Sequence, residues 1–144
     1  MKRLLLLFFT LLLLNCTKNP ERYITFLDGY WEISEVILPD GTKKIYDFNN
    51  TVDYIKITDS LTGFRKKLKP TLTGGFQTSN DGEELKLKIE NDSLNVYYNT
   101  PFAQWKETIL SATENELLVI NKAKVRYLYK RYQPIDFSND QTQQ

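Results

Sequence analysis

Short runs of alternating apolar and polar residues cover most of this 144-residue chain. The clearest run is 85–90, in which Leu85, Leu87 and Ile89 alternate with charged residues. A turn at 90–93 leads into residues 94–99, where the alternation recurs. Side chains two residues apart lie on the same face of a strand, so the pattern is typical of strands with one face on a core and the other in water. We expect the two runs to form a β-hairpin.

Similar runs follow one another along the chain and are separated by turn residues. We expect further strands at 31–38, 45–48, 52–58, 103–111, 117–121 and 125–132. Residues 64–78 are interpreted as one long or bent strand, in which Pro70 limits pairing and Gly74-Gly75 indicates a bulge. No stretch of the domain has a helical period. Eight or nine short strands predict an all-β sandwich or barrel, and short connections favour a small antiparallel up-and-down β-barrel without exposed edges.

The first fifteen residues have a different pattern. A basic start, Met1-Lys2-Arg3, is followed by an apolar run at 4–14 that only Thr10 interrupts. A membrane-spanning helix needs about 20 residues, so the run predicts a signal peptide. With Leu13-Leu14-Asn15-Cys16 it resembles a bacterial lipoprotein precursor, in which signal peptidase cuts before a cysteine that then carries lipid. The alternative is an ordinary secretory signal, but no Ala, Gly or Ser lies near this site.

The resemblance implies a lipid on Cys16 that holds the protein at a membrane. We expect a location in the cell envelope, at the outer membrane, on either its periplasmic or its surface side. The chain divides into a signal peptide (1–15), the lipidated cysteine and a tether (16–25), a barrel (26–132) and a polar tail (133–144). The tail has too few apolar residues to order itself, so we expect it to be disordered.

Composition excludes several classes of function. The chain has no histidine, so catalysis that requires a histidine base is excluded. Cys16 is the single cysteine, so a lipidated chain has no disulfide and no thiolate metal site. Without Lys2 and Arg3 the mature chain has 17 basic and 18 acidic residues. That balance argues against nucleic-acid binding. We expect no enzyme activity, no metal and no cofactor.

Three further stretches carry a second resemblance: LDGYWEI at 27–33, the strand, turn and strand at 105–118, and YLYKR at 127–131. Together they are similar to bacterial lipocalin-like domain lipoproteins over residues 26–132. The resemblance implies a small up-and-down barrel that binds a hydrophobic molecule. It also implies that Gly29 and Trp31 lie at the closed end, where Arg131 packs across the indole; such a contact contributes about 0.5 to 2 kcal/mol. Arg126 is the alternative for that role.

Aromatic residues and two carboxylates are candidates for the interior. An eight-stranded barrel holds only its own side chains or one small ligand. The aromatic residues that could line a ligand cavity, or else form plain core, are Tyr54, Phe76, Tyr98, Trp105, Tyr127 and Tyr129.

Glu35 and Glu107 fall in phase with apolar neighbours, so perfect alternation would bury both carboxylates. A buried carboxylate is costly unless it is paired. One hypothesis therefore pairs them inside the barrel with Arg126, Arg131 or a polar ligand. The other, which we favour, moves them to the rim or shifts their phase through bulges.

The run RKKLK at 65–69 is the one basic cluster in the sequence. We favour a solvated strand face, and the alternative is contact with anionic lipid headgroups. Overall, we expect a lipid-anchored, non-enzymatic barrel that binds a small hydrophobic ligand. The alternative is a protein-interaction module, an accessory subunit or inhibitor that contacts an envelope protein. A continuous apolar cavity would favour the ligand carrier, and a filled core would favour the module.

Overall fold

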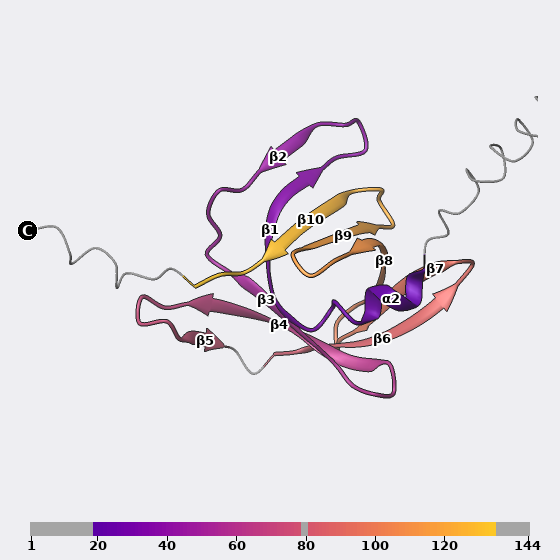
Figure 1. Ribbon diagram of the computed structural model, residues 1–144, viewed down its shortest axis with the longest axis horizontal. Coiled ribbons are helices and arrows are strands. Elements are labelled where there is room, and N and C mark those ends of the chain that lie inside the picture. Colours follow the sequence, from indigo (N-terminus) through magenta and orange to yellow (C-terminus); the bar gives the residue numbers. More distant parts are fainter. Residues whose placement is uncertain (1–18, 79–80, 135–144) are drawn as a thin grey trace, which may run out of the picture.

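The structure is a computed structural model that describes residues 19–78 and 81–134. The expected signal peptide, Cys16 and most of the expected polar tail lie outside the described residues. One short helix precedes ten strands (Figure 1): α2 (Pro20–Ile24), β1 (Gly29–Ile37), β2 (Lys43–Ile45), β3 (Val52–Ile57), β4 (Thr62–Pro70), β5 (Phe76–Thr78), β6 (Glu83–Glu90), β7 (Ser93–Asn99), β8 (Gln104–Ala112), β9 (Glu116–Asn121) and β10 (Arg126–Arg131). Among the described residues, no helix is long and apolar enough to cross a membrane.

Eight of the strands form a closed antiparallel barrel. The order is β10-β9-β8-β7-β6-β4-β3-β1, and a pairing between β1 and β10 closes it. The two other strands lie outside this path, because β2 pairs with β1 and β5 pairs with β4. The predicted all-β, up-and-down barrel is therefore confirmed, with two short hairpin strands added to it.

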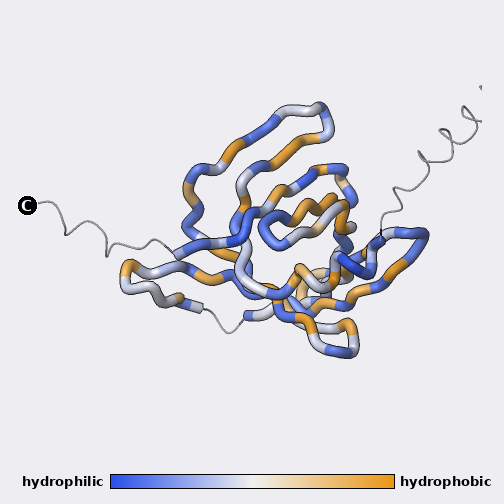
Figure 2. Tube along the Cα trace, viewed as in Figure 1, coloured by the Kyte–Doolittle hydropathy of each residue, from blue (hydrophilic) through white to orange (hydrophobic). Residues whose placement is uncertain are grey.

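The core lies inside the barrel, as the alternation of apolar residues predicts. Figure 2 shows hydrophobic and hydrophilic positions interleaved along the strands. Side chains from seven strands and from the segment before β1 pack together in the interior: Leu27, Trp31, Ile55, Leu85, Leu87, Val96, Tyr98, Ile109, Leu117, Val119 and Tyr129. Two irregularities in register, between Ile33 and Glu35 and between Ile109 and Ser111, shift which residues face inward.

Residues 64–78 form two strands and not the single bent strand that the sequence indicated. β4 ends at Pro70, and residues 71–75 form a tight turn into β5. The turn is closed by the backbone N–H of Thr71, which donates to the Gly75 carbonyl oxygen at 2.9 Å. Gly74 has a φ of 82°, which glycine adopts without a steric penalty. The two glycines therefore serve a turn and not a bulge. β2 also begins and ends earlier than the expected strand at 45–48.

The segment expected to be a tether is partly helical. Asn19 caps α2 by accepting a hydrogen bond from the backbone N–H of Glu21 at 3.1 Å, and Pro20 occupies the first turn. Tyr23 and Ile24 pack against the core, and α2 lies against β7 and β8. The folded unit thus begins near Asn19 and not at Phe26. A helix of five residues is too short to show the period by which helices are found in sequence.

Candidate functional site

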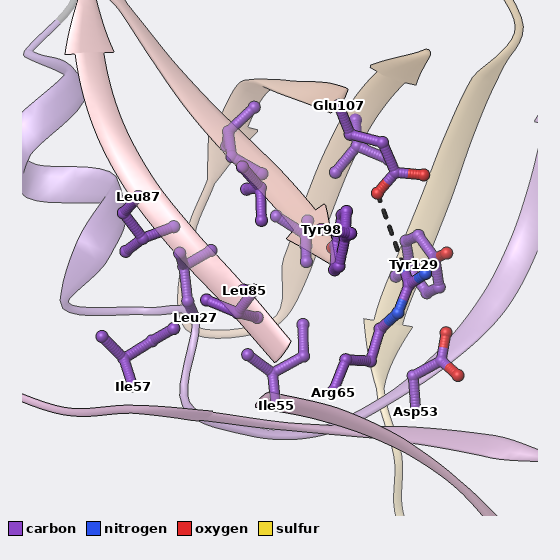
Figure 3. A pocket seen from close by; sticks show the side chains of 14 residues that line it. Leu27, Asp53, Ile55, Ile57, Arg65, Leu85, Leu87, Tyr98, Glu107 and Tyr129 are labelled. Carbon is purple, nitrogen blue, oxygen red and sulfur yellow. Dashed lines mark hydrogen bonds and ion pairs between the residues drawn. The ribbon is translucent and has the colours of Figure 1, made fainter. Parts of the chain in front are cut away.

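A group of charged side chains lies inside the barrel, where the sequence predicted mostly apolar residues. Asp53 on β3, Arg65 on β4 and Glu107 on β8 are 5%, 7% and 9% exposed. Strand alternation places two of them inward, because Asp53 is in phase with the buried Ile55 and Glu107 is in phase with the buried Ile109. Figure 3 shows Arg65 reaching across the interior toward Glu107.

Arg65 connects the two sides of this cluster. Its Nε donates to Glu83 Oε2 at 2.6 Å, and its Nη1 donates to Glu107 Oε2 at 3.4 Å. Asp53 is held separately, because its Oδ1 accepts a hydrogen bond from Lys67 Nζ at 2.8 Å. Buried charges are tolerated when they are paired in this way. Each of the three buried charges is thus paired with an oppositely charged side chain of the barrel.

Aromatic rings enclose the guanidinium group. Its carbon lies 4.3 Å from the centroid of the Tyr98 ring and 6.0 Å from that of Trp105. The Tyr98 and Trp105 rings are themselves stacked, with centroids 4.9 Å apart. A cation over an aromatic face gains electrostatic energy, and more when water is excluded. Arg65 therefore has favourable contacts of two kinds, ion pairs to carboxylates and cation–π contacts to aromatic faces.

Burial also changes the proton affinities of this cluster. It raises the pKa of Glu107, although the charge of Arg65 acts in the opposite direction. Burial raises the pKa of Tyr98 and of Tyr129 as well, so both hydroxyl groups stay protonated near neutral pH. For Arg65, burial opposes the charge, but the surrounding tyrosines and carboxylates outweigh it and raise the pKa. Arg65 therefore stays charged.

The space left in the interior is small. A cavity of about 20 Å³ lies beside the charged cluster, and its walls include Asp53, Arg65, Tyr98, Glu107 and Tyr129. A cavity needs roughly 10–15 Å³ by this measure to hold one water molecule. The barrel is thus filled by its own side chains and leaves space for about one water.

The closed end is built by the three residues that the resemblance assigned to it. Trp31 is fully buried, and the guanidinium carbon of Arg131 lies 3.6 Å from its ring centroid. Arg131 also donates to three backbone carbonyl oxygens, those of Phe26, Asp28 and Glu114. Gly29 has a φ of +124°, and a Cβ atom there would lie 2.5 Å from Arg131 Nη1. This end is a structural closure in which Arg131 needs a residue without a side chain at position 29.

The six aromatic candidates occupy three different places. Tyr98 and Tyr129 line the small cavity, while Trp105 stacks on Tyr98 and Tyr127 packs against the core. Tyr54 and Phe76 lie outside the barrel wall, where each stacks on Tyr30 at 4.7 and 5.0 Å between centroids. Strand alternation explains the split, because Tyr54 is out of phase with the inward Asp53 and Ile55.

The two carboxylates that the sequence singled out also have different environments. The register shift between Ile33 and Glu35 turns Glu35 toward β2, where Lys43 Nζ lies 2.9 Å from its Oε1. Glu107 does face inward, so the hypothesis that both lie at the rim or out of phase is wrong for this residue. Its partner is Arg65, and neither Arg126 nor Arg131 reaches it.

Arg65 was missed because it belongs to the basic run at 65–69, which we interpreted as a solvated face. The structure divides this run: Arg65 and Leu68 are buried, Lys67 pairs with Asp53, and Lys69 is exposed. A usable signal was present in the sequence. If one carboxylate on β8 faces a barrel interior, a cation on another strand must face it.

Among the grooves that the described residues form on the outer surface, two are lined by residues relevant to binding. The first, called here the apolar groove, has a volume of about 340 Å³ and lies between the loop after β2, the β4–β5 turn and the end of β10. Its apolar members are Phe48, Pro70, Leu72, Tyr132 and Pro134. Phe48 and Leu72 are 70% and 85% exposed. The second groove is wider, about 1060 Å³, and lies over β4, β6, β7 and β8. Within residues 19–78 and 81–134, no group of three metal-ligating side chains comes together.

Comparison with known proteins matches residues 27–119 to the lipocalin-like domain family. A search of curated proteins finds no match. Two solved structures resemble the chain. One is a lipocalin-like protein from Bacteroides uniformis, with 8% identity, a TM-score of 0.46, and coverage of 74% of this chain and 98% of that one. The other is an uncharacterized protein from Bacteroides eggerthii, with 11% identity, a TM-score of 0.46, and coverage of 74% and 99%.

Proposed function

Because this chain belongs to the family of lipocalin-like domains, we propose that it is a lipid-anchored, non-enzymatic protein of a bacterial cell envelope that binds a protein partner through its outer surface. The observation that carries this proposal is the filled interior. A cavity of about 20 Å³ does not accommodate a hydrophobic molecule, for which binding sites of roughly 300 Å³ or more are usual. Opening the barrel would also require separating the Arg65 ion pairs.

The anchor in this proposal is a lipid on Cys16. The basic start and the short apolar run support a signal peptide, and the cysteine directly follows it. A single acyl chain gives only marginal membrane binding, so stable attachment needs more than one chain or a second attraction.

The partner-binding surface in this proposal is the apolar groove. Phe48 and Leu72 project from it although they are large and apolar, which is typical of an interaction site on a protein surface. Charged side chains also line the groove, with Glu32 Oε1 3.5 Å from Lys130 Nζ. Apolar anchors within a polar surround are the usual anatomy of a protein interface. An extended segment of an envelope protein fits a groove of this size.

Native mass spectrometry of the full chain, expressed in a bacterial envelope, tests the first part of the proposal. We expect the mass of a chain that begins at Cys16 and carries acyl groups, with no further molecule bound. A mass without acyl groups would refute the anchor. A small molecule bound in stoichiometric amount would refute the proposal of a filled barrel that binds a protein partner. It would favour a barrel that carries a small ligand.

Crosslinking in intact cells of the native host tests the partner. A photoreactive residue at position 72 should give one discrete product, and the substitution Phe48→Ser in the same chain should remove it. Position 102 is the matched control, because Phe102 is also a highly exposed apolar residue, in the β7–β8 turn, but lies outside the apolar groove. Products that are equal at both positions, or that are insensitive to Phe48→Ser, would contradict the assignment. A product with twice the mass of the chain would identify a second copy as the occupant.

A further inference from the structure

Four lysines gather on the wide outer groove. Lys66 comes from β4, Lys86 and Lys88 from β6, and Lys106 from β8; they are called here the lysine face. Lys86 and Lys106 both lie opposite Tyr97 in the β-sheet register, one from each neighbouring strand. Lys88 Nζ lies over the same ring, 4.9 Å from its centroid. The β9–β10 turn extends the charge, since Lys122 and Lys124 line an adjoining hollow with Lys106.

Four lysines elsewhere on the described part of the chain form ion pairs, and the members of the lysine face do not. Lys43, Lys56, Lys67 and Lys130 each lie within ion-pair distance of a carboxylate. In the described part of the chain, no carboxylate lies that close to any member of the lysine face. Glu84 lines the groove and Glu90 lies near Lys88 and Lys106. Glu90 is occupied by hydrogen bonds from Tyr97 and Asn95, at 2.6 and 3.0 Å.

The position of α2 brings this face near the site of attachment. Asn19 caps the helix, so Cys16 is separated from the folded unit by Thr17 and Lys18 alone. Three steps along the chain span at most about 11 Å. α2 packs against β7 and β8, and Figure 1 shows it beside these strands. β8 carries Lys106, and β7 carries Tyr97, over which Lys88 lies.

The charges at the closed end argue against an orientation in which that end of the barrel faces the membrane. The exposed turns there carry Asp59, Asp92 and Glu114. An anionic bilayer would repel these carboxylates, whereas it attracts lysines that lie within a Debye length of its surface. The charge pattern therefore favours a domain that lies on its β6–β8 side.

We propose that the lysine face is the membrane-contact surface of this domain and that it binds anionic phospholipid headgroups. This inference rests on the proposed lipid anchor only for its biological setting, because the surface can be tested without the lipid. Each lysine contributes about a fivefold gain in affinity near an anionic membrane. Together with an acyl chain, such a face provides the second attraction that stable attachment needs.

The test uses the chain from Thr17 onward, which contains every described element but carries no lipid. It is sedimented with vesicles of phosphatidylcholine alone or mixed with phosphatidylglycerol. We expect binding only where phosphatidylglycerol is present. The variant K86Q/K88Q/K106Q should bind on the order of a hundredfold more weakly. The control K43Q/K44Q/K69Q removes the same charge from exposed positions off the lysine face and should bind nearly as well as the wild type.

Three outcomes would overturn the inference: no binding of the wild type to phosphatidylglycerol, equal losses in both variants, or preferred binding to an acidic polysaccharide such as polygalacturonate. The last outcome would assign the lysine face to an anionic glycan. None of these results depends on whether Cys16 is acylated, so a failure here is distinct from a failure of the anchor. Unchanged circular dichroism of each variant shows that the barrel is intact.

Discussion

At the residue scale, Arg65 is the side chain on which the interior depends. It is 7% exposed and is the cation in the described residues that reaches both Glu83 and Glu107. Removing one partner of a buried ion pair leaves the other charge uncompensated, which costs about 3–5 kcal/mol. Replacing both partners by apolar groups costs far less. Each charge of the cluster therefore needs its partner, although the ion pairs add little net stability compared with apolar residues in the same places.

The substitution Arg65→Leu should lower the free energy of unfolding by about 3–5 kcal/mol, because it leaves Glu107 buried without a counter-ion. Urea unfolding followed by tryptophan fluorescence measures the change. Arg126→Leu is the control, since Arg126 is exposed and should change stability by less than about 0.5 kcal/mol. Equal effects of the two substitutions would show that Arg65 is not held in a buried ion pair.

Glu107 gives stability a dependence on pH. Burial raises its pKa in the folded state, so the folded protein retains this proton at pH values where the unfolded chain has lost it. The free energy of unfolding should therefore fall as the pH rises from about 4.3, the ordinary value for glutamate, through the raised pKa. Glu107→Gln lacks this titration. The free energy of unfolding of this variant, relative to that of the wild type, should therefore increase as the pH rises over that window. Urea unfolding of both proteins at several pH values measures the difference. A difference that does not change with pH would contradict the assignment.

Gly29 should not tolerate a side chain. Gly29→Ala combines a strained φ with a Cβ that would lie 2.5 Å from Arg131 Nη1. Gly41→Ala is a matched control, because Gly41 also has a positive φ but has nothing within 4 Å of the added atom. We expect the control to cost about 1–2 kcal/mol, and Gly29→Ala to cost at least about 1 kcal/mol more. Thermal unfolding of both variants compares them directly.

At the element scale, β5 is an added strand that pairs with the barrel strand β4 and stacks against the outer wall through an aromatic side chain. β5 pairs with β4, and Phe76 holds it against the outer wall through Tyr30 and Tyr132, with centroids 5.0 and 5.8 Å away. β5 lies at an edge of the sheet, off the closed path of the barrel. Elements of this kind open locally at a lower free energy than the core does.

Phe76→Ala should release β5 while leaving the barrel closed. We expect faster hydrogen exchange by at least about tenfold in residues 68–78, because the stacked rings contribute about 1–3 kcal/mol to holding the hairpin. Exchange in β7 and β8 should remain unchanged. Leu72→Ala is the control, since Leu72 lies in the same hairpin but is 85% exposed. Faster exchange across the whole barrel would contradict local release.

Most strands were predictable because apolar residues on the inward face alternate in sequence with polar residues on the outward face. β6 and β7 alternate so regularly that their hairpin follows from the pattern. Two residues depart from it, because Ile89 is 41% exposed near the turn and Asn95 is buried. The bulges in β1 and β8 were not predictable by position, because an extra residue changes the phase without changing composition. α2 escaped detection because its five residues cover little more than one turn. The charged cluster was half predictable: Glu107 was in phase, but Arg65 was concealed among lysines.

At the scale of the whole molecule, the structural closure and the apolar groove lie at different ends of the barrel. The closed end carries α2, Trp31 and Arg131, and it faces the short link to Cys16. The apolar groove lies toward the other end, beside the β4–β5 turn and the loop after β2. In Figure 1 these two segments lie on the opposite side of the barrel from α2. A domain that lies on its lysine face thus keeps Phe48 and Leu72 accessible to a partner.

The buried arginine also shows how this scaffold can be redesigned. Arg65 spans the space between opposite walls of the barrel, so its side chain occupies the volume that a guest molecule would need. A chain with Arg65→Ala and Glu107→Ala removes both charges of this buried ion pair together. Glu83 also loses its partner, but its side chain is 27% exposed and reaches water. The walls that remain are largely aliphatic and aromatic, from Leu85, Leu87, Val96 and Val119 among others. Engineered in this way, the barrel should acquire a vacant chamber and become a receptor for small apolar dyes, which a fluorescence titration against the parent chain would reveal.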